Sequence, residues 1–133
     1  MVPTTCGPLT IVDCFVRALG DGRLDDAQGL LHDDLVVTEA GGLPFSGEYC
    51  GARGFVELLS EITKYFELML GPTIEYLSTG QMVAMRGRMT FTSRTSGRSV
   101  EIGLVELFEV RHGLIVDLDI YYKDPTAVAS LLA

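Results

Sequence analysis

The hydrophobic residues follow a helical period in the first half of the chain and a period of two in the second half. After Pro8, which suits the first turn of a helix, apolar residues recur at helical spacing until Gly20-Asp21-Gly22. A second, shorter helix is predicted to begin at Asp25-Asp26 and to end near His32-Asp33-Asp34. The segment from Leu35 to Glu39 alternates between apolar and polar residues and is predicted to be a strand.

A third helical pattern is the longest of the chain. Gly71-Pro72 is predicted to end it, because a glycine can cap the last turn and a proline cannot continue the helix. Its apolar face consists of Phe55, Leu58, Leu59, Ile62, Phe66 and Met69.

The period of two then predicts four strands, at roughly 73–78, 82–93, 98–110 and 114–122. Ser96-Gly97 and His112-Gly113 are typical of hairpin turns, so neighbouring strands are expected to be antiparallel. A short helix is expected after Asp124-Pro125. Helices followed by a meander predict one α+β domain spanning residues 1–133.

Strand parity separates two glutamates from the other acidic residues, because alternate residues of a strand face opposite sides of the sheet. Between positions 100 and 110 every even-numbered residue is apolar except Glu106. Glu39 likewise has the parity of the apolar residues in its own strand. We expect both glutamates to face the interior, whereas Asp117 and Asp119 are expected to face outward.

Two inward carboxyl groups indicate acid and base chemistry. Burying an ionised carboxylate without a partner costs several kcal/mol, so such a group pairs, accepts hydrogen bonds, or takes up a proton as its pKa rises. A neutral carboxylic acid can donate a hydrogen bond to a developing oxyanion, and a second carboxylate can serve as general base. The alternative is structural: Glu106 pairs with an arginine or a hydroxyl, and Glu39 lies at a solvated strand end.

Composition narrows the classes of partner. The chain of 133 residues is 47% hydrophobic and carries a formal net charge of -8, which disfavours binding to nucleic acid or to an anionic membrane. No apolar run approaches the ~18 residues of a membrane-spanning helix, and the amino terminus lacks a basic leader, so a cytoplasmic location is expected. The cysteines, Cys6, Cys14 and Cys50, are odd in number and lack metal-ligand spacing, so neither a disulfide framework nor a metal site is predicted.

Three segments, "LLHDDLVV", "FSGEYCGARGFVELL" and "GRSVEIGLVELFEVRHGLIVDLDIYY", resemble the nuclear-transport-factor-2-like superfamily, and the resemblance covers nearly the whole chain. The superfamily includes ketosteroid isomerase, SnoaL-like polyketide cyclases and limonene-epoxide hydrolase. The resemblance implies a cone-shaped α+β fold, with three N-terminal helices packed on a curved, mostly antiparallel sheet, and a homodimer.

Compared with ketosteroid isomerase, Glu39 falls where that family keeps its catalytic base, and Glu106 falls where it keeps a protonated aspartate. The chain departs from the family at Phe15 and Leu59, which replace the oxyanion tyrosine and its supporting tyrosine. Compared with the epoxide hydrolase and the SnoaL-like cyclases, the catalytic aspartate of the last strand falls on Ile120. Glu39 and Glu106 are therefore the acid and base pair that the resemblance supports.

Together, parity and resemblance predict an enzyme without cofactor or metal, an isomerase or cyclase of secondary metabolism. Its substrate would be an apolar, carbonyl-bearing small molecule such as a polyketide or terpenoid intermediate. Two alternatives remain open: an epoxide hydrolase or epoxide-opening cyclase that uses the same carboxylates, and a dimeric protein that binds a small molecule without transforming it. The substrate pocket is predicted to be lined by Phe15, Val37, Leu59, Met89, Leu104, Phe108, Leu118, Ile120 and Tyr122.

Overall fold

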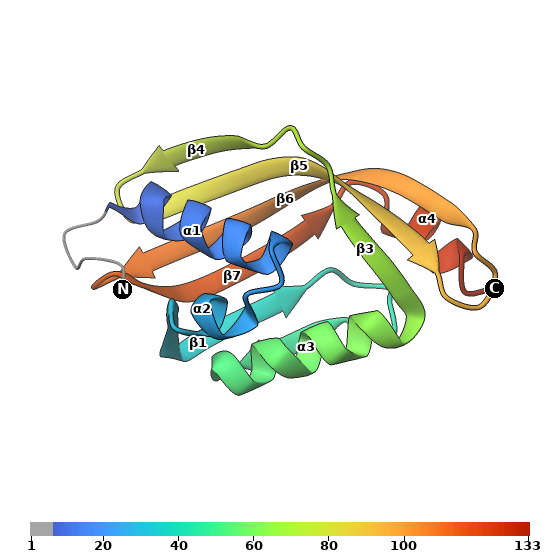
Figure 1. The fold of residues 1–133 in the computed structure, drawn as a ribbon, viewed down its shortest axis with the longest axis horizontal. Coiled ribbons are helices and arrows are strands. Elements are labelled where there is room, and N and C mark those ends of the chain that lie inside the picture. Colours follow the sequence, from blue (N-terminus) through green and yellow to red (C-terminus); the bar gives the residue numbers. More distant parts are fainter. Residues whose placement is uncertain (1–6) are drawn as a thin grey trace.

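A curled sheet carries two of the helices on its inner face in the structure, a computed structural model that describes residues 7–133 (Figure 1). The helices of this part of the chain are α1 (Pro8–Gly20), α2 (Leu24–Gln28), α3 (Gly51–Tyr65) and α4 (Pro125–Ser130). Its strands are β1 (Leu31–Glu39), β2 (Gly47–Cys50), β3 (Phe66–Leu70), β4 (Glu75–Thr79), β5 (Met82–Ser93), β6 (Ser99–Arg111) and β7 (Leu114–Tyr122).

The strands are ordered β2-β1-β7-β6-β5-β3, and β4 also pairs with β5. All neighbouring strands are antiparallel except β1 and β7, which run parallel. The turn between β6 and β7 uses His112 and Gly113, both with positive φ, as expected for a tight hairpin. The predicted α+β fold with a curved, mostly antiparallel sheet is therefore confirmed.

Helices α1 and α3 occupy different parts of the inner face. Helix α1 contacts β4, β5, β6 and β7, whereas α3 contacts β1, β2 and β3. Helix α3 starts at Gly51, whose φ of 71° a glycine adopts without strain. Gly54 brings α3 against β2, since a Cβ at this position would lie 2.9 Å from the backbone of Tyr49.

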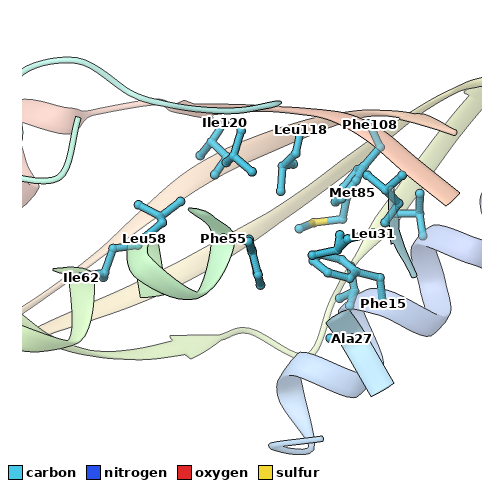
Figure 2. Close-up of a cluster of buried hydrophobic side chains, with 14 of the residues drawn as sticks. Phe15, Ala27, Leu31, Phe55, Leu58, Ile62, Met85, Phe108, Leu118 and Ile120 are labelled. Carbon is cyan, nitrogen blue, oxygen red and sulfur yellow. The ribbon is translucent and has the colours of Figure 1, made fainter. Parts of the chain in front are cut away.

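Apolar side chains from both helices and the sheet fill the space between them. Figure 2 shows Phe15 of α1 and Phe55 of α3 facing the side chains of Phe108 and Leu118 from the sheet. The ring of Phe15 packs against Phe55 with centroids 5.3 Å apart and against Phe108 with centroids 5.9 Å apart. A second aromatic series, Phe45, Phe66, Phe91 and Tyr122, packs edge to face along the sheet.

Two predicted element boundaries are wrong, and one strand was not predicted. Helix α3 ends at Tyr65 instead of reaching Gly71, and Phe66–Leu70 forms β3. Helix α2 ends at Gln28 and is followed by a turn at residues 29–30, and His32-Asp33-Asp34 belongs to β1. Strand β2 was not predicted, because its four residues are mostly exposed and carry no alternation.

No helix within residues 7–133 is both long and apolar enough to cross a membrane. Cys14 and Cys50 are free thiols, and Cys6 lies outside the described residues.

Candidate functional site

Glu39 ends β1 with its side chain directed into the protein interior, and only 4% of its surface is exposed. Its Oε1 accepts a hydrogen bond from the backbone N–H of Ala40 at 2.8 Å, and its Oε2 accepts one from the hydroxyl of Tyr122 at 3.1 Å. Burial raises the pKa of Glu39 to about 7; both hydrogen bonds oppose this shift, and the charge of Glu106 adds to it. Glu39 is therefore not at a solvated strand end.

Glu106 lies in the middle of β6 on the same inner face, between Met85 of β5 and Ile120 of β7. Burial raises its pKa to about 7 as well. The residue is half-buried, with part of its surface accessible to solvent. Within residues 7–133 the Glu106 side chain makes no hydrogen bond. Every completely buried side-chain oxygen or nitrogen in these residues has a hydrogen-bond partner, so the two Glu106 oxygens are not completely buried and water can reach them.

Strand register brings the two glutamates to one row across the sheet. Ile120 pairs with Glu106, and the parallel pairing of Val37 with Leu118, continued by two residues, places Glu39 beside Ile120. One strand separates them, so their backbones lie about 10 Å apart, twice the spacing of neighbouring strands. A ring placed over Ile120 can contact both carboxyl groups.

Positive charge is excluded from this interior. All ten lysines and arginines of the chain are exposed. On the outer face of the sheet Arg86 pairs with Glu75 and Arg88 pairs with Glu101. Within residues 7–133, neither inner carboxyl group is therefore stabilised in its ionised form by a lysine or an arginine.

The residues predicted to line the pocket fall into two groups. Phe15, Val37, Leu104, Phe108, Leu118 and Ile120 are buried in the core, with at most 7% of their surface exposed. Leu59, Met89 and Tyr122 are partly exposed and pack against that core. That these side chains line a substrate pocket stays a prediction; neither of the two hollows of residues 7–133 described next is bordered by Glu39 or Glu106.

Two hollows of residues 7–133 lie away from the glutamates. One, of about 580 Å³, lies on the outer face and is bordered by Arg86, Arg88, Tyr121 and Lys123. The other, of about 370 Å³, lies between β2 and α3. Tyr122 borders the first hollow while its hydroxyl reaches Glu39 on the opposite face.

Tyr76 also belongs to the row of Glu106, and the sequence analysis did not identify it. Tyr76 pairs with Met85, which in turn pairs with Glu106. Its hydroxyl donates to Asp13 of α1 at 3.2 Å, and burial together with Asp13 raises its pKa. The sequence carries no alternation that marks Tyr76, because it is the least exposed residue of a short strand whose other residues are all exposed.

No group of three His, Cys, Asp or Glu residues in the described part of the chain is arranged to hold a metal ion. The arrangement can support proton transfer by two carboxyl groups of similar, raised pKa, with the Tyr122 hydroxyl beside Glu39.

A sequence model of the SnoaL-like domain matches residues 12–118. The chain belongs to the SnoaL-like domain family. Membership confirms the resemblance to the nuclear-transport-factor-2-like superfamily that the sequence segments indicated. No match is found among the curated proteins.

Solved structures share the fold of this SnoaL-like domain. An NTF2-like protein of Burkholderia thailandensis superposes with a TM-score of 0.87 at 22% identity, covering 97% of this chain and 99% of that one. TerC, co-crystallised with polyporic acid, gives a TM-score of 0.85 at 19% identity, with 94% and 97% covered. A protein of Xanthomonas campestris described as a proposed polyketide cyclase gives 0.81 at 18% identity, with 93% and 96% covered.

Proposed function

We propose that this SnoaL-like domain is a cofactor-independent isomerase or cyclase that moves protons on an apolar, carbonyl-bearing small molecule, such as a polyketide or terpenoid intermediate. The observation that carries the proposal is the pair Glu39 and Glu106, which share one inner row of the sheet without a cationic partner among residues 7–133. Carboxyl groups with a pKa near the working pH are effective general acids and bases.

The hydrogen bonds support a different role for each glutamate. Glu39 receives two donors, which favour its ionised form, whereas Glu106 receives no hydrogen bond within the described residues. Because each raised pKa is about 7, the pair can share one proton near neutral pH, and in the proposed mechanism that proton is on Glu106. Glu39 then removes a proton next to the carbonyl group, and neutral Glu106 donates a hydrogen bond to the enolate oxygen.

The relatives support the type of ligand. A neighbour in fold is described as a proposed polyketide cyclase, and TerC was crystallised with polyporic acid. Both statements concern those proteins, and they favour a small organic molecule as the ligand of this fold.

The test follows proton removal directly. We choose 2-tetralone as probe, an apolar ketone with acidic protons beside its carbonyl group, and measure by NMR the initial rate of deuterium incorporation in heavy water. The wild-type chain is expected to accelerate exchange over buffer. Glu39→Gln and Glu106→Gln are each expected to lower the catalysed rate ~100-fold or more.

Glu101→Gln is the matched control, because Glu101 lies on β6 but faces outward and pairs with Arg88. It is expected to keep the wild-type rate. Exchange that is unchanged in both inner variants would end the proposal. Binding of 2-tetralone without any exchange would favour the ligand-binding alternative, and hydrolysis of an apolar epoxide that depends on Glu39 would favour epoxide opening.

The homodimer implied by the resemblance stays a prediction. Light scattering of the purified chain measures its mass against the 14.5 kDa of one copy.

A further inference from the structure

Tyr122 is the last residue of β7 and lies beside the end of β1. Its hydroxyl donates to Oε2 of Glu39 at 3.1 Å, a bond between residues 83 positions apart in the chain. The ring is held in place, since it packs edge to face on Phe91 with centroids 5.4 Å apart. The hydroxyl therefore has a fixed direction relative to Glu39.

We propose that Tyr122 is the positioning residue of Glu39: its hydroxyl orients the carboxylate as a base and keeps it ionised while Glu106 holds the proton. This inference rests on the proposed function and adds a residue to it. The N–H of Ala40 holds Oε1 and Tyr122 holds Oε2, so two donors fix the plane of the carboxylate. The lone pairs that remain point in one set of directions, which is what proton removal from a bound ketone requires.

The tyrosine is suited to this task because it does not lose its own proton. Burial, and then the negative charges of Glu39 and Glu106, raise the pKa of Tyr122 well above its ordinary value. It therefore donates to Glu39 at every working pH. The other titratable groups close to Glu39 are Glu106 on β6 and Tyr49 on β2, whose hydroxyl donates to the carbonyl oxygen of Phe45.

Loss of the hydroxyl has a specific consequence. A hydrogen bond to a carboxylate favours its ionised form, so Tyr122→Phe is expected to raise the pKa of Glu39 by about one unit. The shared proton then moves from Glu106 towards Glu39. The site loses its base and its donor in the same step, although both glutamates are still present.

The neighbouring residue supplies a matched control. The hydroxyl of Tyr121 donates to Asp119 at 2.5 Å, but 53% of Tyr121 is exposed, on the outer face. Tyr121→Phe therefore removes the same kind of bond one position away, without touching the inner row. A purely structural effect of losing a tyrosine–carboxylate bond would appear in both variants.

The experiment is an NMR titration of chains carrying ¹³C-labelled glutamate side chains, with Glu39→Gln to assign the Glu39 signal. We expect the Glu39 midpoint to rise by about one unit in Tyr122→Phe and to stay at the wild-type value in Tyr121→Phe. In the 2-tetralone assay, the pH at which exchange reaches half its maximum is expected to rise by the same amount. An unchanged Glu39 midpoint in Tyr122→Phe overturns the inference.

The titration needs no substrate, so the proposed reaction and the role of Tyr122 can each be refuted without the other. A shifted midpoint with no 2-tetralone exchange by the wild type supports the contact and removes the proposed reaction. Exchange with an unshifted midpoint removes the role of Tyr122 alone. Should Tyr122→Phe not fold, the wild-type chain made with 3-fluorotyrosine keeps every hydroxyl, and its more acidic phenol is expected to lower the Glu39 midpoint; an unchanged midpoint there counts against the inference.

Discussion

Replacing Glu106 with glutamine changes how the stability of the fold depends on pH. Burial raises the pKa of Glu106 from its ordinary value of 4.5 to about 7, so between these values the folded chain binds more protons than the unfolded chain. The contribution of Glu106 to stability is therefore fully present below pH 4.5 and is lost as the pH rises through about 7. Glutamine has a similar shape and does not ionise.

The size of the effect follows from the shift. A change from 4.5 to about 7, at about 1.4 kcal/mol for each pKa unit, corresponds to about 3 kcal/mol. Because water reaches part of the Glu106 side chain, this value is an upper limit. The free energy of unfolding of Glu106→Gln minus that of the wild type is expected to rise by up to this amount between pH 4.5 and pH 7.

Urea unfolding followed by circular dichroism measures the difference at several pH values across this interval. Glu101→Gln is again the control, because its carboxylate is exposed in the folded chain and pairs with Arg88. Its difference from the wild type is expected to vary little with pH. If the difference between wild type and Glu106→Gln is the same at both ends of the interval, Glu106 is not held in an environment that disfavours its charge, and the acid role assigned to it fails as well.

Two further predictions concern packing and ligand charge. Gly54→Ala is expected to lower the free energy of unfolding by roughly 1–3 kcal/mol, measured in urea, because the added Cβ would lie 2.9 Å from the Tyr49 backbone; Gly41→Ala, in open space with no atom within 4 Å, is the control. Because the inner row carries carboxyl groups and all ten cations of the chain are exposed, 2-naphthol is expected to bind at least ~10-fold more tightly than 2-naphthoate by calorimetry, and equal affinity would contradict this electrostatic account.

Sequence patterns were sufficient where alternation was unbroken. In β6 and β7 the even residues are apolar except Glu106, so parity alone placed Glu106 inside and Asp119 outside. The pattern failed between Tyr65 and Gly71 because this segment fits both periods. Phe66 and Met69 continue the apolar face of helix α3, but Phe66, Leu68 and Leu70 also form one face of a strand. Pairing with residues of β5 that are 19 to 27 positions away in sequence decides between the two, and Met69 becomes 71% exposed.

For a related reason, sequence patterns could not identify the residues that contact the two glutamates. The bond between Tyr122 and Glu39 depends on the parallel pairing of β1 with β7, which joins opposite ends of the chain. Parity placed both side chains on the inner face, but it does not say which strands are neighbours. Tyr76 was missed because its strand is short and otherwise exposed, so that a single inward residue left no periodic signal.

The exclusion of cations from the interior explains how two similar glutamates can hold different protonation states. A buried arginine beside either carboxyl group would lower its pKa and favour an ion pair, and in the proposed reaction an ionised Glu106 has no proton to donate. With neutral donors alone, the difference depends on hydrogen bonds: Glu39 has two, and Glu106 has none within the described residues. These two bonds oppose the burial of Glu39 and leave its pKa at about 7, the same as that of Glu106, so one proton can be shared between the two carboxyl groups near neutral pH.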